Sequence, residues 1–116
     1  MVYGGPGDNV IDLSGVTRAA FTNLAADADG PGQDNVAVFG GDGNGTVTGS
    51  EFNDKIWGDG DDDTLNGGSG KDLMEGGEGN DTLYAGSNSG NSLDGGAGNE
   101  VLYGDDWTNT MAGGTG

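Results

Sequence analysis

Glycine opens a nine-residue unit again and again along most of this chain. The opening residues are Gly40, Gly49, Gly58, Gly67 and Gly76, and after one inserted residue near Ala85 the series resumes at Gly86, Gly95, Gly104 and Gly113. The eighth place of the units holds a large apolar residue each time, namely Val47, Ile56, Leu65, Met74, Leu83, Leu93, Leu102 and Met111. A fixed period of this kind predicts a repeat architecture, in which each unit buries its apolar residue by stacking on its neighbours.

The composition leaves little material for an apolar core. Only 31% of the 116 residues are hydrophobic, and 28 are glycine. There are 20 Asp plus Glu but only three Lys plus Arg, which gives a formal net charge of −17. An acidic chain this rich in glycine would ordinarily stay unfolded, because glycine loses the most backbone entropy on folding and the charges repel. We therefore expect a bound cofactor to supply part of the folding free energy.

The residue types present restrict what that cofactor can be. The chain has neither Cys nor His, which removes disulfides, thiolate and imidazole ligands, and the usual general base. Oxygen ligands suit hard cations, and flexible sites with roughly six to eight oxygens favour calcium over magnesium. The negative charge disfavours nucleic acid, and no apolar run approaches the ~20 residues of a membrane span. Residues 1–30 also lack the pattern of a cleaved secretion signal.

The sixth place of the units carries the candidate ligands. It holds Asp54, Asp63, Asp72 and Asp81, then Asn91, Glu100 and Asn109, with Gly45 in the first unit. Weaker copies at residues 4–12 (GGPGDNVID) and 29–37 (DGPGQDNVA) put Asn9 and Asp34 at this place. Solubilising charge would not keep a nine-residue phase, so we expect cation binding here. The other acids are expected to be surface charge, and they include Asp59, Asp61, Asp62, Asp105 and Asp106.

Two units match a known repeat residue by residue. Residues 67–75 (GGSGKDLME) and 76–84 (GGEGNDTLY) fit the pattern G-G-x-G-x-D-x-U-x, where U is a large aliphatic. Over about residues 40–112 the chain resembles the calcium-binding repeat-in-toxin (RTX) family. The resemblance implies an all-β fold, a right-handed parallel β-roll (β-solenoid) in which six residues of each unit form a turn and three a strand. Two units complete one coil, and several Ca²⁺ ions lie between stacked turns.

The resemblance also implies which residues hold the ions. The strongest sites pair Asp54 with Asp72 and Asp63 with Asp81. Asn91, Glu100 and Asn109 give weaker sites further along, and turn glycines contribute carbonyls, namely Gly49, Gly58, Gly67, Gly70, Gly76 and Gly79. We expect glycines at the first, second and fourth places to supply the positive φ angles of the turns. The fourth-place glycine is replaced in four turns, by Phe52, Asp61, Ser89 and Trp107.

Three segments are predicted. Residues 1–39 form an atypical N-terminal coil and cap with degenerate repeats, in which residues 17–28 (TRAAFTNLAADA) cover the end of the roll through Phe21 and Leu24. Residues 40–112 form the roll of eight units. Residues 113–116 begin a further repeat and are cut short.

We expect no enzymatic activity, because the chain offers no nucleophile–base pair. The leading interpretation is a calcium-binding structural module of a secreted bacterial protein, exported by type I secretion machinery and folding outside the cell or at its surface. Two alternatives stay open. One is an adhesin-type module that recognises ice or carbohydrate through an outward Thr and Tyr face, although β-propensity alone also explains such residues. The other is the non-catalytic C-terminal tail of a secreted lipase, protease or polysaccharide-modifying enzyme.

Overall fold

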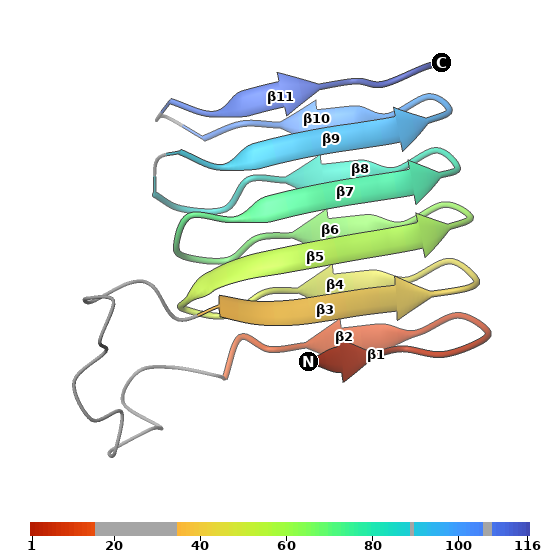
Figure 1. The fold of residues 1–116 in the computed structure, drawn as a ribbon, viewed down its shortest axis with the longest axis horizontal. Helices are drawn as coiled ribbons and strands as arrows, with labels where there is room; N and C mark the ends of the chain where they lie inside the picture. The colour runs from red at the N-terminus through yellow and green to blue at the C-terminus, as the bar shows by residue number, and fades with distance from the viewer. Residues whose placement is uncertain (16–34, 89, 106–107) are drawn as a thin grey trace.

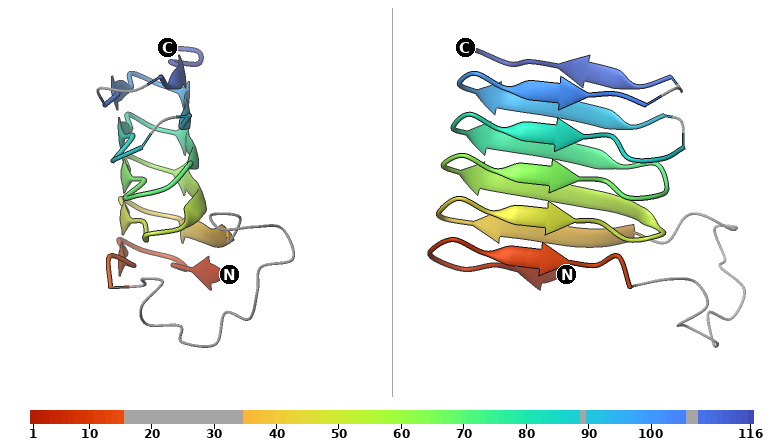
Figure 2. Two further views of the ribbon diagram at one scale, coloured as in Figure 1. Left: turned by 90° about the vertical axis from the view of Figure 1, so that its left-hand side faces the viewer. Right: turned by 180° about the vertical axis from the view of Figure 1, so that it is seen from behind.

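The fold is known from a computed structural model that describes residues 1–15, 35–88, 90–105 and 108–116. Its strands form two parallel sheets that lie face to face (Figures 1 and 2). The six-stranded sheet contains, in spatial order, β1 (Val2–Tyr3), β3 (Asn35–Gly41), β5 (Asn53–Gly60), β7 (Leu73–Glu78), β9 (Ser92–Ala97) and β11 (Thr110–Ala112). The five-stranded sheet contains β10 (Val101–Tyr103), β8 (Thr82–Tyr84), β6 (Thr64–Asn66), β4 (Thr46–Thr48) and β2 (Val10–Asp12).

The chain passes from one sheet to the other after every strand. In Figure 1 the front strands run one way and the rear strands return, so that the coils rise as a right-handed helix, the hand favoured for parallel connections. Thr46 pairs with Thr64, and Thr64 with Thr82, so each coil contains two nine-residue units. The predicted parallel β-solenoid is confirmed. Among the described residues, no helix is long and apolar enough to cross a membrane.

The eighth-place residues fill the space between the sheets. Six of them are at most 1% exposed, namely Val47, Ile56, Leu65, Met74, Leu83 and Leu93, because successive side chains of a strand point to opposite faces and the middle one points inward. Leu102 is partly buried. Met111 is 50% exposed, since β11 is the edge strand of its sheet among the described residues. The prediction of a buried eighth place is wrong at that residue.

The inserted residue lies later than predicted. The N–H of Ser87 donates to the carbonyl of Gly68, so Gly86 stands at the second place of its turn, and Ala85 opens the unit. The N–H of Asp72 donates to Asn91, 19 residues further on instead of 18. The extra residue therefore falls between Ser87 and Asn91. A turn accommodates it, whereas in a strand it would reverse every following side chain.

The two weak copies at the N-terminus differ in outcome. In residues 4–12 the register is confirmed, because Ile11 pairs with Val47. In the second copy Val36 pairs with Asp54 and Val38 with Ile56, and Val38 is fully buried. Strand pairing therefore puts Val36, not Asp34, at the sixth place, and the predicted register is wrong by two residues. Asp34 itself and the predicted cap at residues 17–28 lie outside the described residues.

Glycine has two separate uses in the turns. In most turns the second and fourth places have positive φ, as at Gly68 (86°) and Gly70 (115°), and Asp59 (83°) and Asp61 (67°) adopt it as well. Asn88 (85°) stands at the fourth place of its turn, while the predicted fourth-place residues Ser89 and Trp107 lie outside the described residues. The first-place glycines have no positive φ, so that part of the prediction is wrong. In the units that open from Gly4 to Gly76, a Cβ at the first place would overlap the first-place carbonyl of the next coil, and the reason for glycine there is space.

Candidate metal centres

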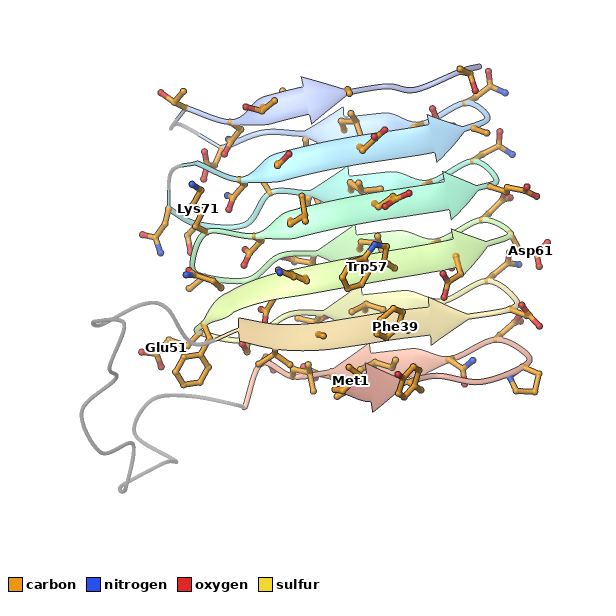
Figure 3. All side chains as sticks on the ribbon, viewed as in Figure 1. Met1, Phe39, Glu51, Trp57, Asp61 and Lys71 are labelled. Carbon is orange, nitrogen blue, oxygen red and sulfur yellow. The ribbon has the colours of Figure 1, made fainter. Side chains whose placement is uncertain are left out.

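The sixth-place side chains form two columns, one along each edge of the roll. In Figure 3 the labels Asp61 and Lys71 mark these two edges. Asp63 and Asp81 lie in the turns that follow β5 and β7. At the other edge Asp72 lies in the turn that precedes β7, and Asp54 is the second residue of β5. The structure therefore brings together the residue pairs that the sequence predicted. We refer to the turns that end at Asp63, Asp72 and Asp81 as the aspartate turns.

One carboxylate oxygen of each aspartate turn holds the neighbouring coil. Oδ1 of Asp63 accepts the N–H of Gly45 at 2.7 Å, and Oδ1 of Asp81 accepts the N–H of Asp63 at 2.8 Å. In the other column Oδ1 of Asp72 accepts the N–H of Asp54 at 2.8 Å. Half of each carboxylate is therefore used to stack the coils, a role that the sequence did not indicate.

The other carboxylate oxygen has no such partner. Within the described part of the chain, no hydrogen-bond donor reaches the buried Oδ2 atoms of Asp63, Asp72 and Asp81. Oε1 of Glu100, one coil beyond Asp81, is in the same condition among those residues. A buried polar oxygen without a donor costs roughly 1–3 kcal/mol. Each aspartate turn therefore needs a proton or a cation.

The pKa values of these carboxyls also indicate that the charged form is unfavourable without a cation. Burial raises the pKa of Asp72 to about 7 and that of Asp63 to about 6. Nearby carboxylates add to this effect, Asp54 on the pKa of Asp72 and Asp81 on that of Asp63. Burial also raises the pKa of Asp54 and Asp81. In the metal-free roll the charged forms are thus unfavourable, and a dication between the turns would reverse that.

The first-place glycines leave room for an ion. The space that a Cβ of Gly58 would fill is bordered by Oδ2 of Asp63 and by the carbonyl of Gly76. Likewise, Oδ2 of Asp72 borders the space beside Gly67. No group of three or more acidic, His or Cys side chains converges among the described residues, so an ion there would take most of its ligands from the main chain. Carboxylate with carbonyl oxygens is the donor set that calcium prefers, and the turns fit it.

The predicted glycines fall into both classes of turn position. Gly49, Gly58, Gly67 and Gly76 stand at first places, where a Cβ would overlap the carboxylate of the same turn. Gly70 and Gly79 stand at fourth places, with φ of 115° and 132°.

Asp54 differs from the other three aspartates. Its Oδ2 accepts the N–H of Ser50 at 2.7 Å, and its Oδ1 accepts the Ser50 hydroxyl at 2.9 Å. Ser50 replaces the second-place glycine, and Phe52, at the fourth place, is buried at 4% exposure. Both carboxylate oxygens are therefore engaged, and in the predicted Asp54–Asp72 pair only Asp72 presents an oxygen that lacks a donor among the described residues.

The sixth-place asparagines also satisfy their amides inside the turns. Asn9 donates to the carbonyls of Gly5 and Gly7 in its own turn. Asn91 does the same with two carbonyls of its turn. Asn109 donates to Oδ1 of Asp105 at 2.7 Å. These residues lie in the predicted columns, but each directs an amide N–H group where the aspartates direct an oxygen.

A second column of side chains, at the fifth place of the units, was not predicted from the sequence. Oδ1 of Asp62 accepts the N–H of Asn80 at 2.7 Å, and Oδ1 of Asn44 accepts that of Asp62 at 2.9 Å. The same bond recurs above and below, from Asn99 to Asn80 and from Asn44 to Asp8. The signal was visible, because Asp or Asn fills this place in unit after unit. These bonds need no ion, and Asp62 is more than surface charge.

Aromatic side chains stack on the outer faces of both sheets. On the six-stranded sheet the rings of Tyr3 and Phe39 stack at 4.9 Å, and those of Phe39 and Trp57 at 4.8 Å, as Figure 3 shows for the labelled pair. On the five-stranded sheet Tyr84 and Tyr103 stack at 4.8 Å with 5° between their planes. Each stacked contact covers one face of each ring, while Tyr3 remains 66% and Tyr103 49% exposed.

Comparison with protein families gives one match. Residues 39–74, 67–89 and 86–110 match the RTX calcium-binding nonapeptide repeat in four copies, and together these segments cover more than half of the 116 residues. Comparisons with curated proteins and with solved structures give no match. The matched segments contain all three aspartate turns and the strands between them. The chain belongs to the family of RTX calcium-binding nonapeptide repeats.

Proposed function

We propose that this chain is a module that folds when calcium binds to its aspartate turns. The observation that carries the proposal is the buried Oδ2 of Asp63, Asp72 and Asp81, which meets no donor among the described residues. Several Ca²⁺ ions would each supply two positive charges next to such an oxygen. Glu100 extends the series, since its Oε1 is buried in the same way.

Calcium would also reduce the electrostatic repulsion among the many acidic side chains of the chain. A formal net charge of −17 opposes compaction, and the core is a single thin layer of aliphatic side chains that both sheets contribute. Because the turns of different coils come together only in the folded roll, ion binding and folding are one event. The folded chain places Oδ2 of each aspartate turn and the turn carbonyls around the same space beside the first-place glycine.

Circular dichroism of the chain in chelator, then with calcium, tests this proposal. We expect little β signal in chelator and a full β signal at millimolar calcium, whereas magnesium at equal concentration substitutes poorly because it keeps its waters and demands a rigid octahedral shell. An unchanged β signal in chelator would contradict the proposal.

We further propose that the module belongs to an exported bacterial protein and has no catalytic role of its own. Calcium-dependent folding suits a chain that passes type I secretion machinery unfolded and folds outside the cell. The complete lack of His and Cys supports a non-catalytic role. Such a module fits the tail of a secreted lipase, protease or polysaccharide-modifying enzyme.

The adhesin alternative has mixed support from the outer face. Thr46, Thr64 and Thr82 pair in register and form a regular ladder of hydroxyls, as an ice-binding face would require. Tyr84 and Tyr103 each cover one face of the other ring, which leaves only their outer faces for a sugar to stack on. We therefore keep ice over carbohydrate as the second candidate ligand.

A further inference from the structure

We propose that the side-chain amides of Asn9 and Asn91 close their turns in place of a cation, so that these asparagine turns keep their shape without calcium. The inference rests on the proposed function, because it divides the turns of the roll into those that need an ion and those that do not.

The amide of Asn91 lies in the same orientation as the carboxylates of the aspartate turns. Its Oδ1 accepts the N–H of Asp72 at 2.8 Å, which is the bond that Asp81 makes to the N–H of Asp63 at the other edge. Since the oxygen has the same partner in both cases, Nδ2 of Asn91 takes the place of the buried Oδ2. From there it donates to the carbonyls of Ala85 at 3.1 Å and Asn88 at 3.0 Å.

The turn that ends at Asn9, at the opposite edge of the roll, also directs the side-chain amide at two carbonyls of its own turn and shares the fourth-place contact. There Nδ2 donates to the carbonyl of Gly5 at 2.9 Å and to that of Gly7 at 2.5 Å. Gly7 and Asn88 both stand at the fourth place of their turns, with φ of 87° and 85°. Two turns of different sequence thus direct the fourth-place carbonyl at the sixth-place amide, which makes the contact a property of the turn geometry.

The exchange of one atom changes what the turn requires. An aspartate directs a negative oxygen at carbonyl oxygens, and a positive charge must lie between them. Asn91 directs its two N–H donors at the carbonyls of Ala85 and Asn88, so a neutral side chain satisfies these carbonyls. Asparagine at the sixth place is therefore a substitute for the ion, rather than a weak ligand for it.

Counting bound ions in a matched pair of variants tests the proposal. Native mass spectrometry of the full chain at saturating calcium would compare Asn91→Asp with the wild type. We expect one more Ca²⁺ in Asn91→Asp, because the new Oδ2 faces the same carbonyls without a donor. An unchanged ion count in a folded Asn91→Asp chain would overturn the inference. A wild-type chain that binds no calcium would instead overturn the proposed function.

The reverse exchange tests the same idea without relying on a new site. Asp81→Asn should lose one ion yet stay folded at saturating calcium, because its amide can close the turn. Asp81→Ala loses the ion and cannot close the turn, so its thermal midpoint should lie several degrees below that of Asp81→Asn. Equal thermal midpoints for the two variants would contradict amide closure, and this pair decides the matter if Asn91→Asp fails to fold.

Discussion

The turn that ends at Asp81 and the turn that ends at Asn91 share one side-chain contact and differ in the other. Oδ1 has the same kind of partner in both residues, but Oδ2 of Asp81 and Nδ2 of Asn91 have opposite hydrogen-bonding roles. In both, Oδ1 accepts a backbone N–H of the neighbouring coil at 2.8 Å. In the first, no donor among the described residues reaches the buried Oδ2; in the second, Nδ2 donates to two carbonyls. Stacking is therefore common to both kinds of turn, while a single atom decides whether an ion is needed.

The largest effect should separate the middle of the roll from its end. Asp81→Ala removes the acceptor for the N–H of Asp63 and the buried oxygen that faces the ion site. We expect a loss of about 2 kcal/mol or more, and a calcium midpoint of folding raised tenfold or more. Asn109→Ala, in the last complete turn, should shift the midpoint by less than threefold. Calcium titrations followed by circular dichroism measure both, and equal shifts would refute the difference between the two regions.

A steric change at an aspartate turn should have the next largest effect. In Gly67→Ala the new Cβ overlaps Oδ2 of Asp72 and the carbonyl of Ala85, so we expect a loss of about 1–3 kcal/mol. Gly60→Ala is the control, because its φ is not positive and nothing lies within 4 Å of a Cβ there. Thermal unfolding at saturating calcium compares the two. If Gly60→Ala is as destabilising as Gly67→Ala, space beside the carboxylate is not the reason for glycine.

Acid should partly replace calcium in the aspartate turns. The pKa of Asp72 is raised from 3.8 to about 7 by burial, so the folded chain binds more protons than the unfolded chain between these values. Stability of the metal-free roll should therefore rise as the pH falls from about 7 toward 4. Circular dichroism in calcium-free buffer at pH 8 and pH 5 should show more β structure at pH 5. Asp72→Asn should reduce the difference, and a β signal that grows with pH would contradict the burial of charge.

The smallest change in stability is expected on the outer face of the five-stranded sheet, which lies away from both kinds of turn. Thr64 is exposed between Thr46 and Thr82, and Thr64→Tyr should change stability by less than about 0.5 kcal/mol with an unaltered calcium midpoint. If the face binds ice or sugar, that binding should disappear in ice-shaping or glycan assays. A large loss of calcium-induced folding in Thr64→Tyr would show that the face is coupled to the turns.

The strand register could be predicted because the period itself sets it. Val47, Leu65 and Leu83 recur at one coil spacing, and each must pair with the next to stay buried. The position of the insertion could not be read in the same way. Glycine serves both the first and the second place of a turn, so Gly86 looked like an opening residue although it stands second.

The chemistry of the turns was predictable by residue type but not by atom. The sixth-place column indicated cation ligands. The sequence does not show, however, that Oδ1 of Asp72 accepts a backbone N–H of the neighbouring coil while Oδ2 has no donor among the described residues. For the same reason Asn91 was predicted as a weak ligand. Ser50 was missed as the partner of Asp54 because the contact depends on a turn that departs from the repeat.

Anomalous diffraction from crystals of the chain grown with calcium tests the central claim most directly. We expect calcium peaks about 2.3–2.6 Å from Oδ2 of Asp63, Asp72 and Asp81, and none beside Nδ2 of Asn91. Calcium bound only at exposed acids such as Asp62, with no peak beside the three Oδ2 atoms, would contradict calcium binding in the aspartate turns.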